Sequence, residues 1–529
     1  MKRSTYSPSL LIAALIGFTL VGCHYERPIS STHKLESLLQ VIGQKYVDTV
    51  NMEDLVEKTI PKILAELDPH SVYIPAQKIE ETNQELRGSF SGIGIQFMIQ
   101  ADTIYVSDVI SGGPAEKVGL MAGDRIVTID DSLYIGKMIS NDGAMKRLKG
   151  PKGSEVSLGI KRVGEKDLLQ FTIVRGNIPV KSIDASYLIN ERWCYMKINK
   201  FGETTYPEML ISLAQGIQKG AQGIIVDLRG NTGGYMGAAI QMVNEFLPKG
   251  EMIVYTEGEN APRYEEHANG YGSCQQMPIV VLTDEISASA SEIFAGAIQD
   301  NDRGTIIGRR TFGKGLVQQP IEFDDGSAIR LTIARYYTPS GRCIQKPYTI
   351  GKSEEYELDL LNRYEHGEFF TQDSIKHNES MVYQTKNGRT VYGGGGIMPD
   401  IFVPQDTAGY TSYYAAVAKL GLFTRFPFEY TDQNRQTLAA YTTMEELLHY
   451  LKQQNLLEEF VRHATSKGVK RRNNLIIKSR NLMEDILYGN IIYNMLGMEE
   501  YVKYLNLTDP AVLKAVNILD RGESRPTTK

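Results

Sequence analysis

The strongest constraint on the fold is a pair of short, continuously apolar runs at residues 223–228 and 278–282. Each run is followed by small residues and then by a segment with helical spacing of apolar side chains, at 235–247 and 289–299. Strands that are apolar on both faces and are joined through helices are typical of a buried, largely parallel sheet. Residues 181–405 are therefore predicted to form an α/β core.

The segments on either side of this core have different patterns. Residues 31–87 carry apolar residues at helical spacing, residues 88–180 hold short β-type runs between glycine turns, and residues 406–529 are rich in helix formers. At about 150 residues per domain, a chain of 529 residues predicts roughly three or four units. The expected fold class is a multidomain α+β protein with helical regions at both ends.

Composition excludes several classes of function. A net charge of −6 offers no basic field for nucleic acid, so none is expected as a partner. A local basic cluster at residues 467–472 is interpreted as a solvated helix end. Cys194, Cys274 and Cys343 lack metal-ligand spacing, so neither a metal site nor a disulfide framework is expected.

The N-terminus has the pattern of an export signal. Lys2 and Arg3 precede an apolar run at 10–21 that is too short for a membrane span. The following Leu-Val-Gly-Cys resembles the lipobox of bacterial lipoproteins, which implies cleavage after residue 22 and a lipid anchor on Cys23. The expected location is the bacterial envelope, facing the periplasm from the inner or outer membrane; an ordinary cleaved signal with a chance cysteine is the alternative.

The β-rich segment 88–180 contains a set of glycines that resembles a permuted bacterial PDZ domain. The loop Gly92, Ile93, Gly94 and Ile95 is followed by Gly-Gly-Pro-Ala from residue 112 and by further glycine turns. Backbone N–H groups in such a loop can hold a peptide carboxylate, while the adjacent strand edge accepts an added strand. The alternative is a generic β-turn module.

A candidate nucleophile lies where the second apolar run passes into its helix. Ser289 would sit at the helix start, where unsatisfied N–H groups such as that of Ala290 form an oxyanion site. Taken alone, this segment is better explained by helix capping, since a serine with Glu292 three residues later forms a capping box.

Downstream, Lys314 lies between two glycines in an apolar, uncharged stretch. Burial of such a lysine lowers its pKa, so that its neutral amine can act as a general base. Arg309 and Arg310 are close in sequence and are candidates for lowering this pKa further. His70, in an Asp-Pro-His turn, is interpreted as structural.

These motifs together resemble the carboxyl-terminal processing peptidases, also called tail-specific proteases, of serine peptidase family S41. The resemblance rests on Ser-Ala-Ser-Ala-Ser-Glu at 287–292, Thr-Phe-Gly-Lys-Gly at 311–315 and Asp-Leu-Arg-Gly-Asn-Thr-Gly-Gly at 227–234. It implies a ClpP/crotonase-like core with an inserted PDZ domain and a serine–lysine dyad without cofactor. Ser289 would be the nucleophile, Lys314 the base and Gln318 the residue that orients the lysine, with Gly233 and Ala290 forming the oxyanion hole.

The expected function is therefore a serine endopeptidase that recognises C-terminal tails of envelope proteins through its PDZ domain. A catalytically silent PDZ scaffold is the main alternative, and the intact set of Ser289, Lys314 and Gln318 argues against it. An acyl-CoA enzyme of the crotonase type is disfavoured by the export signal. Expected partners are proteins with exposed C-termini and the membrane, while an adaptor protein and a homo-oligomer stay open.

Overall fold

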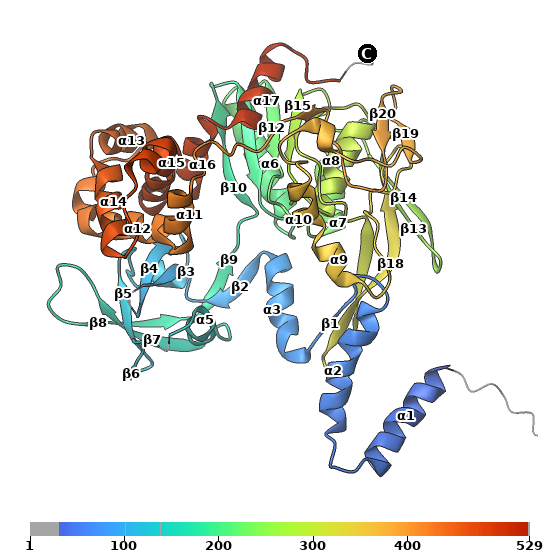
Figure 1. The fold of residues 1–529 in the computed structure, drawn as a ribbon, viewed down its shortest axis with the longest axis horizontal. Coiled ribbons are helices and arrows are strands. Elements are labelled where there is room, and N and C mark those ends of the chain that lie inside the picture. The colour runs from blue at the N-terminus through green and yellow to red at the C-terminus, as the bar shows by residue number, and fades with distance from the viewer. Residues whose placement is uncertain (1–30, 101, 138, 527–529) are drawn as a thin grey trace, which may run out of the picture. The chain divides into compact units, whose positions relative to one another are not determined.

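The computed structural model describes residues 31–100, 102–137 and 139–526 (Figure 1). The chain divides into two compact units, residues 1–62 and 63–529. The first unit holds α1 (Ser31–Lys45) and most of α2 (Met52–Ala65), two helices with an apolar stripe as predicted. Cys23 and the predicted signal lie outside the described residues. Within the described ranges, no helix is both long enough and apolar enough to cross a bilayer.

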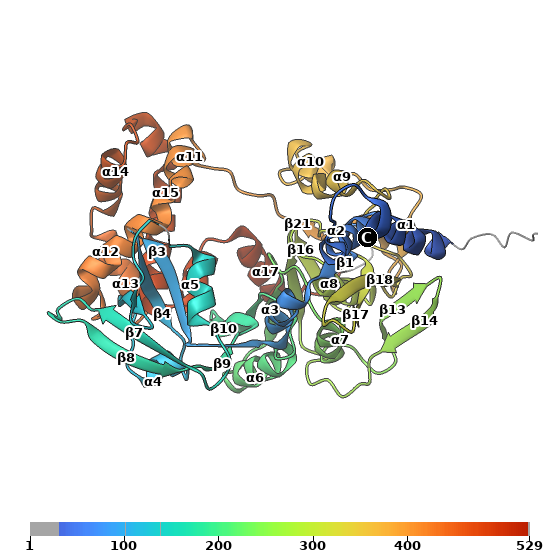
Figure 2. The ribbon, with the colours of Figure 1, turned by 90° about the horizontal axis from the view of Figure 1, so that it is seen from below.

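Residues 88–180 fold into the expected β-rich module, which begins after β1 (Val72–Ile74) and α3 (Ala76–Arg87). β2 (Ser89–Gly92) pairs with β9 (Gly176–Pro179), so the first and last strands of the module close it. The main sheet has the order β3-β4-β5-β7-β8, with β3 at a free edge (Figure 2). The elements of the module between β2 and β9 are β3 (Ile95–Gln100), β4 (Thr103–Val109), α4 (Pro114–Lys117), β5 (Arg125–Ile129), β6 (Ser132–Leu133), α5 (Asn141–Leu148), β7 (Glu155–Lys161) and β8 (Leu169–Val174).

A six-stranded sheet of order β10-β11-β12-β15-β16-β21 forms the centre of the molecule. All neighbouring strands from β11 to β21 pair in parallel, and β10 alone runs antiparallel to its neighbour. This confirms the predicted, largely parallel core sheet. The strands are β10 (Ile183–Ile189), β11 (Trp193–Ile198), β12 (Gly223–Asp227), β15 (Ile279–Thr283), β16 (Thr305–Gly308) and β21 (Ile401–Phe402).

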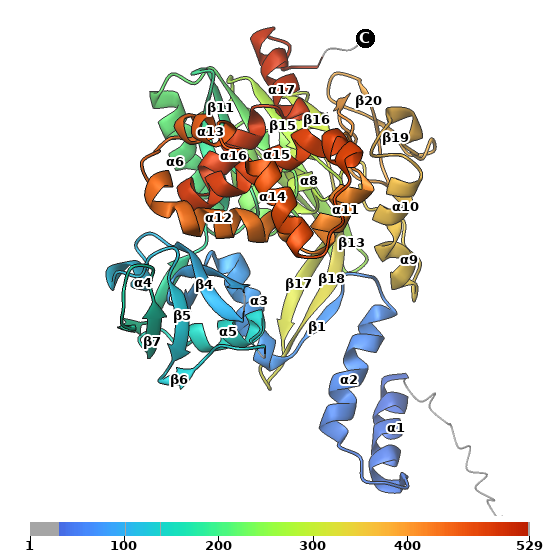
Figure 3. The ribbon, with the colours of Figure 1, turned by 60° about the vertical axis from the view of Figure 1, so that its left-hand side comes forward.

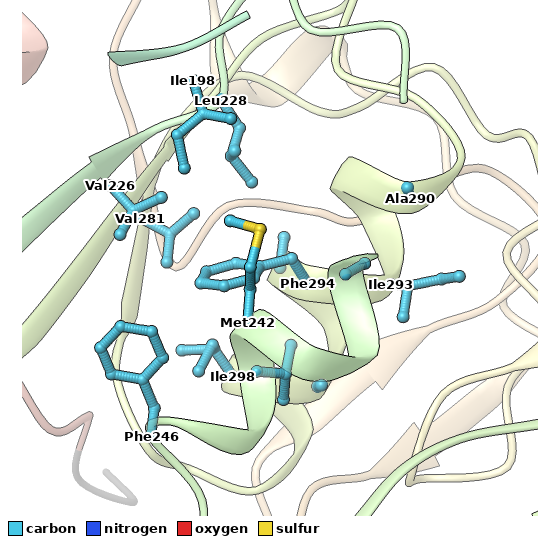
Figure 4. Close-up of a cluster of buried hydrophobic side chains, with 14 of the residues drawn as sticks. Ile198, Val226, Leu228, Met242, Phe246, Val281, Ala290, Ile293, Phe294 and Ile298 are labelled. Carbon is cyan, nitrogen blue, oxygen red and sulfur yellow. The ribbon is translucent and has the colours of Figure 1, made fainter. Parts of the chain in front are cut away.

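Side chains alternate between the two faces of this sheet, as strand geometry requires. Ile224 and Val226 of β12 face one side and Ile225 faces the other. The first side is covered by α6 (Thr205–Gln218), α7 (Met236–Asn244) and α8 (Ala290–Asp300). Figure 4 shows Met242 and Phe294 from two of these helices beside Val226 and Val281 of the strands.

A second, antiparallel sheet has the order β1-β18-β13-β14, with β17 paired to β18. The sequence pattern did not predict it, because these strands are half exposed. Its strands are β13 (Met252–Gly258), β14 (Ala261–His267), β17 (Leu316–Glu322) and β18 (Ala328–Tyr337). Between β18 and β21 come α9 (Ser353–Glu357), α10 (Asp359–Glu365), the 3-10 turn η1 (Gln372–Ser374) and the hairpin of β19 (Val382–Gln384) with β20 (Thr390–Tyr392).

The predicted C-terminal helical region contains two parts with different partners. One part packs on itself, and its helices lie together in Figure 3. Its buried core includes Phe423, Phe460 and Leu487. The other, α17, packs on β15 and β16 of the central sheet. The helices are α11 (Ser412–Lys419), α12 (Leu422–Leu438), α13 (Met444–Lys452), α14 (Leu456–Ser466), α15 (Asn473–Leu496), α16 (Met498–Asn506) and α17 (Pro510–Asp520).

Helix α12 contacts the β-rich module directly. Arg125 of β5 donates to Asp432 at 2.6 Å, and the ring of Tyr105 meets that of Phe428 edge-on at 5.3 Å. On the edge strand β3, the Gln96 side chain accepts a hydrogen bond from the Tyr493 hydroxyl at 2.8 Å. The C-terminal helices therefore pack against the outer face of the sheet whose edge is β3.

Candidate active site

Ser289 occupies the junction between β15 and α8. It is the N-cap of α8 and has φ 56° and ψ −115°. A positive φ is uncommon for a residue with a Cβ, and such strain persists only where the surroundings enforce it. Ala290 is the first helical residue, and amides at this position have no intrahelical acceptor. Both interpretations of this serine, helix cap and candidate nucleophile, are compatible with its position.

The carboxylate of Glu292 connects the serine to the lysine segment. One carboxylate oxygen accepts from the N–H of Ser289 and from the N–H of Lys314, each at 2.8 Å. The other accepts from the hydroxyl of Thr311 at 2.5 Å and from the N–H of Gly313 at 2.7 Å. Glu292 is fully buried, and burial raises its pKa to about 7. One buried side chain thus holds the backbone of Ser289 next to that of Lys314.

Tyr336, on β18, makes a second connection between the same two residues. Its hydroxyl lies within hydrogen-bond distance of the carbonyl oxygens of Ser289, at 3.1 Å, and of Lys314. The ring is 1% exposed, so this connection is part of the protein interior. Sequence reasoning missed Tyr336, because its position depends on the second sheet.

Lys314 is largely desolvated. Burial lowers its pKa, and the charge of Arg330 lowers it further, while Glu292 and Asp68 act in the opposite direction. The expectation that Arg309 and Arg310 act on this lysine is not met, since both are engaged elsewhere. Arg309 pairs with Glu285 and Arg310 with Glu368, each at 2.6 Å.

Two residues of the Asp-Pro-His turn also lie near the lysine. Burial, followed by the charge of Lys314, lowers the pKa of His70 to about 4. Its Nε2 lies 2.8 Å from the hydroxyl of Tyr356. Asp68 accepts from the hydroxyl of Thr332 at 3.0 Å, and Gln318 Nε2 donates to the same hydroxyl at 3.4 Å. Gln318 is thus near the lysine segment, with its side chain directed to β18.

The glycine turn after β12 packs against the serine. A Cβ at Gly233 would lie 2.8 Å from Ser289 Cβ and 3.0 Å from the nitrogen of Ala290, so only glycine fits there. Gly233 has φ 102°, which also favours glycine. Its N–H donates to Asn231 Oδ1 at 2.8 Å, and the Asn231 carbonyl accepts from Ala288 N–H at 3.0 Å. The turn therefore lies beside the side chain of Ser289 and beside the nitrogen of Ala290, where an oxyanion would form.

A charged cluster holds the beginning of this turn. Asp227 is 1% exposed and accepts from Tyr195 at 2.7 Å and from Lys197 at 3.3 Å. The guanidinium of Arg229 donates to both oxygens of Asp227, at distances down to 2.6 Å. Although burial opposes it, the neighbouring Arg229 and Lys197 hold the pKa of Asp227 well below its usual range.

In the part of the chain that the structure describes, the backbones of Ser289 and Lys314 are fastened together, but no hydrogen bond joins their side chains. Catalytic hydrogen bonds are often long in proteins without substrate and tighten on binding. No group of three or more His, Cys, Asp or Glu side chains among the described residues is placed to hold a metal ion.

The predicted carboxylate loop lies between β2 and β3. The carbonyls of Ile93 and Gly94 accept from Ala115 N–H at 2.8 Å and from Ile110 N–H at 3.0 Å. The following amides, of Gly94 and Ile95, are trans to these carbonyls and point away from those partners. A groove is lined by residues of β3 and by residues at and just before the start of α5: Phe97, Met98, Ile99, Ile139, Ser140 and Asn141.

Three family profiles match the chain. Peptidase family S41 matches residues 192–352, a PDZ domain matches residues 91–173, and a family of unknown function (DUF8443) matches residues 413–497. The first range contains Ser289 and Lys314.

Proteins with similar sequences are named as carboxy-terminal processing proteases. The carboxy-terminal processing protease CtpB of Bacillus subtilis is 34% identical over 316 residues, which cover 59% of this chain and 65% of that protein. The carboxy-terminal-processing protease of Bartonella bacilliformis is 36% identical over 313 residues, covering 58% and 71%. Among solved structures, the photosystem II D1 C-terminal processing protease is 26% identical, with a TM-score of 0.34 over 59% of this chain and 89% of that one.

The chain therefore belongs to peptidase family S41, the carboxy-terminal processing serine proteases. It combines the S41 domain with a PDZ domain and with C-terminal helices.

Proposed function

We propose that the protein is a serine endopeptidase that uses Ser289 as nucleophile and Lys314 as general base. The observation that carries this proposal is the Glu292 carboxylate, which fastens the backbone of a strained serine to that of a desolvated lysine. Strain and a shifted pKa in one place are typical of catalytic sites. A scaffold that only binds tails requires neither feature.

The reaction follows from these positions. The neutral amine of Lys314 takes the proton of the Ser289 hydroxyl as Oγ attacks the scissile carbonyl carbon. The resulting oxyanion accepts from the N–H of Ala290 and from an amide of the adjacent glycine turn. For Gly233 to serve, its N–H must turn away from Asn231 Oδ1. The Lys314 ammonium then protonates the leaving amine. The neutral lysine next takes a proton from water as the water oxygen attacks the acyl-enzyme carbonyl, and it returns this proton to Ser289 Oγ as the acid product leaves.

Gln318 would orient Lys314 by family resemblance, through a rotation away from its present partner Thr332. The core would be of the ClpP/crotonase type, with the nucleophile at the start of the helix after a central parallel strand. This assignment is supported by the order of the strands around β15 and by the position of α8.

We propose further that the PDZ domain selects substrates by their C-terminal tails. The outward-pointing amides of Gly94 and Ile95 would bind the terminal carboxylate, and the free edge of β3 would accept the tail as an added strand. The apolar side chains beside this edge favour an apolar tail.

The location proposed for the enzyme is the bacterial envelope, with a lipid on Cys23 holding it to a membrane that faces the periplasm. The proposal rests on the sequence of the first 23 residues. Radiolabelled palmitate should be incorporated by the expressed full-length chain and not by Cys23→Ala. Equal labelling of both would contradict it.

The decisive experiment uses residues 24–529 and an unstructured reporter with an apolar tail. We compare wild type, Ser289→Ala and Lys314→Met, which keeps the length of the side chain without its amine. Lys352→Met, at an exposed lysine paired with Glu355, is the control for loss of one positive charge. Wild type and the control should cleave, and the two site variants should lose at least about a thousandfold in kcat.

Two outcomes would count against the proposal. Cleavage that persists in Ser289→Ala would exclude this nucleophile. Tight tail binding by wild type without cleavage would favour the scaffold interpretation. A second reporter with a charged tail tests PDZ selection, since equal kcat/KM for both reporters would exclude it.

A further inference from the structure

The N-terminus of the last helix meets the glycine turn of the candidate active site. Asp509 is the N-cap of α17, and its Oδ1 accepts from the amides of Ala511 and Val512, each at 2.9 Å. Its Oδ2 accepts from Arg229 Nη1 at 2.8 Å. A residue more than 150 positions beyond the S41 match thus contacts the first residue of the turn.

Arg229 lies between two carboxylates. On one side it binds Asp227, which is buried at the end of β12, and on the other side it binds Asp509. Its side chain is 20% exposed, so these contacts are only partly screened by water. Two fixed carboxylate partners on different sides restrict the position of a guanidinium more than a single partner does.

The backbone of Arg229 is equally constrained. Its carbonyl accepts from Lys197 Nζ, and the next amide, of Gly230, donates to the carboxylate of Asp284 at 2.9 and 3.0 Å. Four residues further on, Gly233 packs against Ser289 and Ala290. A shift of Arg229 is therefore transmitted along a short, tightly bonded turn to the place where an oxyanion would form.

We propose that Asp509 is a positioning residue for this reaction: by holding Arg229, it sets the turn that completes the oxyanion hole. The C-terminal helix is then part of the catalytic unit. This inference rests on the proposed protease function and goes beyond it, since the S41 match ends at residue 352.

A purely structural role for Asp509 makes a different prediction. If the residue only caps α17, any good capping residue should replace it without effect on catalysis. Asparagine caps as well as aspartate. In Asp509→Asn the amide oxygen keeps the cap, while the loss of charge and the amide hydrogens weaken the contact with Arg229.

The test compares Asp509→Asn with Asp520→Asn, both in residues 24–529. Asp520 ends the same helix and accepts from Arg192 at 3.3 Å and from Trp193 Nε1 at 3.1 Å, so the control weakens a more exposed ion pair at the other end of α17. Asp509→Asn should lower kcat roughly tenfold with KM and Tm unchanged, because a small misplacement of oxyanion donors affects mainly the transition state. Asp520→Asn should leave kcat at the wild-type value.

Coupling through Arg229 gives a second readout. In an Arg229→Gln background, Asp509→Asn should cause no further loss of kcat, since the partner through which it acts is gone. Full additivity of the two changes would overturn the inference. So would a wild-type kcat in Asp509→Asn, or a kcat that falls only in step with Tm.

A readout independent of turnover separates this inference from the proposed function. Amide exchange of residues 228–235, measured by mass spectrometry, should be several-fold faster in Asp509→Asn and unchanged in Asp520→Asn. If wild type does not cleave but this exchange responds, the protease proposal fails and the positioning of the turn stands. If the exchange does not respond, the inference itself is overturned.

Discussion

The two faces of the central sheet are built from the same strands but are covered in different ways. Alternate residues of β12 supply Ile224 and Val226 to one face and Ile225 to the other. The first face is covered by α6, α7 and α8, which follow the strands directly in the chain. The second face is covered by α17 together with Val502 of α16, which come from the far end of the sequence. A strand that is apolar on both faces thus specifies that both faces are buried, but not by what.

Removal of α17 should have the largest effect, because it uncovers most of the second face. The helix buries six side chains against the sheet or its neighbours: Ala511, Val512, Ala515, Val516, Ile518 and Leu519. Their burial contributes on the order of 10 kcal/mol, which is comparable with the whole stability of a domain. A chain that ends at Thr508 should therefore not give a folded, soluble protein in size exclusion and thermal melting. A chain that ends at Gly522 keeps α17 and is the control, and equal melting of both would show that the face needs no cover.

Point substitutions on the two faces give a graded version of the same test. Phe294 is fully buried and meets Phe246 edge-on at 5.9 Å. Phe294→Ala should lower the free energy of unfolding by about 3–5 kcal/mol through the cavity it leaves. Val512→Ala on the opposite face should cost about 2 kcal/mol by loss of apolar burial. Urea unfolding measures both, and a negligible effect of Val512→Ala would mean that α17 is only loosely docked.

Glu292→Gln tests the hydrogen bonds by which Glu292 connects the backbone of Ser289 with that of Lys314. The amide of glutamine places hydrogens where the carboxylate accepts four bonds, so the serine and lysine backbones should separate. We expect kcat to fall roughly a hundredfold. Ser291→Ala, at the preceding residue, is the control and loses one buried hydrogen bond to the Asn231 carbonyl. An equal loss in both variants would argue against a special role of Glu292.

Glu292→Gln should also change how the free energy of unfolding depends on pH. Burial raises the pKa of Glu292 from 4.5 to about 7, so the folded protein disfavours its ionised form. The stability from this group is fully present below about pH 4.5 and is lost as pH rises through about 7, by at most about 1.4 kcal/mol per pH unit. Urea unfolding between these pH values should show this fall in wild type and lack it in Glu292→Gln.

The smallest effect is expected from Arg330→Gln. Arg330 lowers the pKa of Lys314, second only to burial. Activity should rise with pH as Lys314 loses its proton, and without Arg330 this rise should move to higher pH by less than about one unit. Arg335→Gln, on the same strand, removes a cation that acts on Tyr337 and Cys343 and is the control. Identical pH profiles of kcat/KM for wild type and Arg330→Gln would exclude the effect.

Local patterns predicted much of the fold. The apolar runs predicted at 223–228 and 278–282 form β12 (Gly223–Asp227) and β15 (Ile279–Thr283), because apolar composition and flanking turn residues act within a few residues. Ser289 at a strand–helix junction was predicted for the same reason. The cation that acts on Lys314 was wrongly sought in Arg309 and Arg310, since proximity along the chain does not give proximity in space. Arg330 reaches the lysine only through the pairing of β17 with β18.

The sequence by itself determined the apolar strands, the glycine turns and the residue types with catalytic chemistry, since periodicity and backbone freedom are properties of short segments. Only the tertiary structure decided which side chains meet across long separations. It placed the Glu292 carboxylate between Ser289 and Lys314, Tyr336 beside both, and Asp509 against Arg229. The physical reason is that burial and ion pairing depend on the packing of distant segments, and no local pattern encodes which distant segment will arrive.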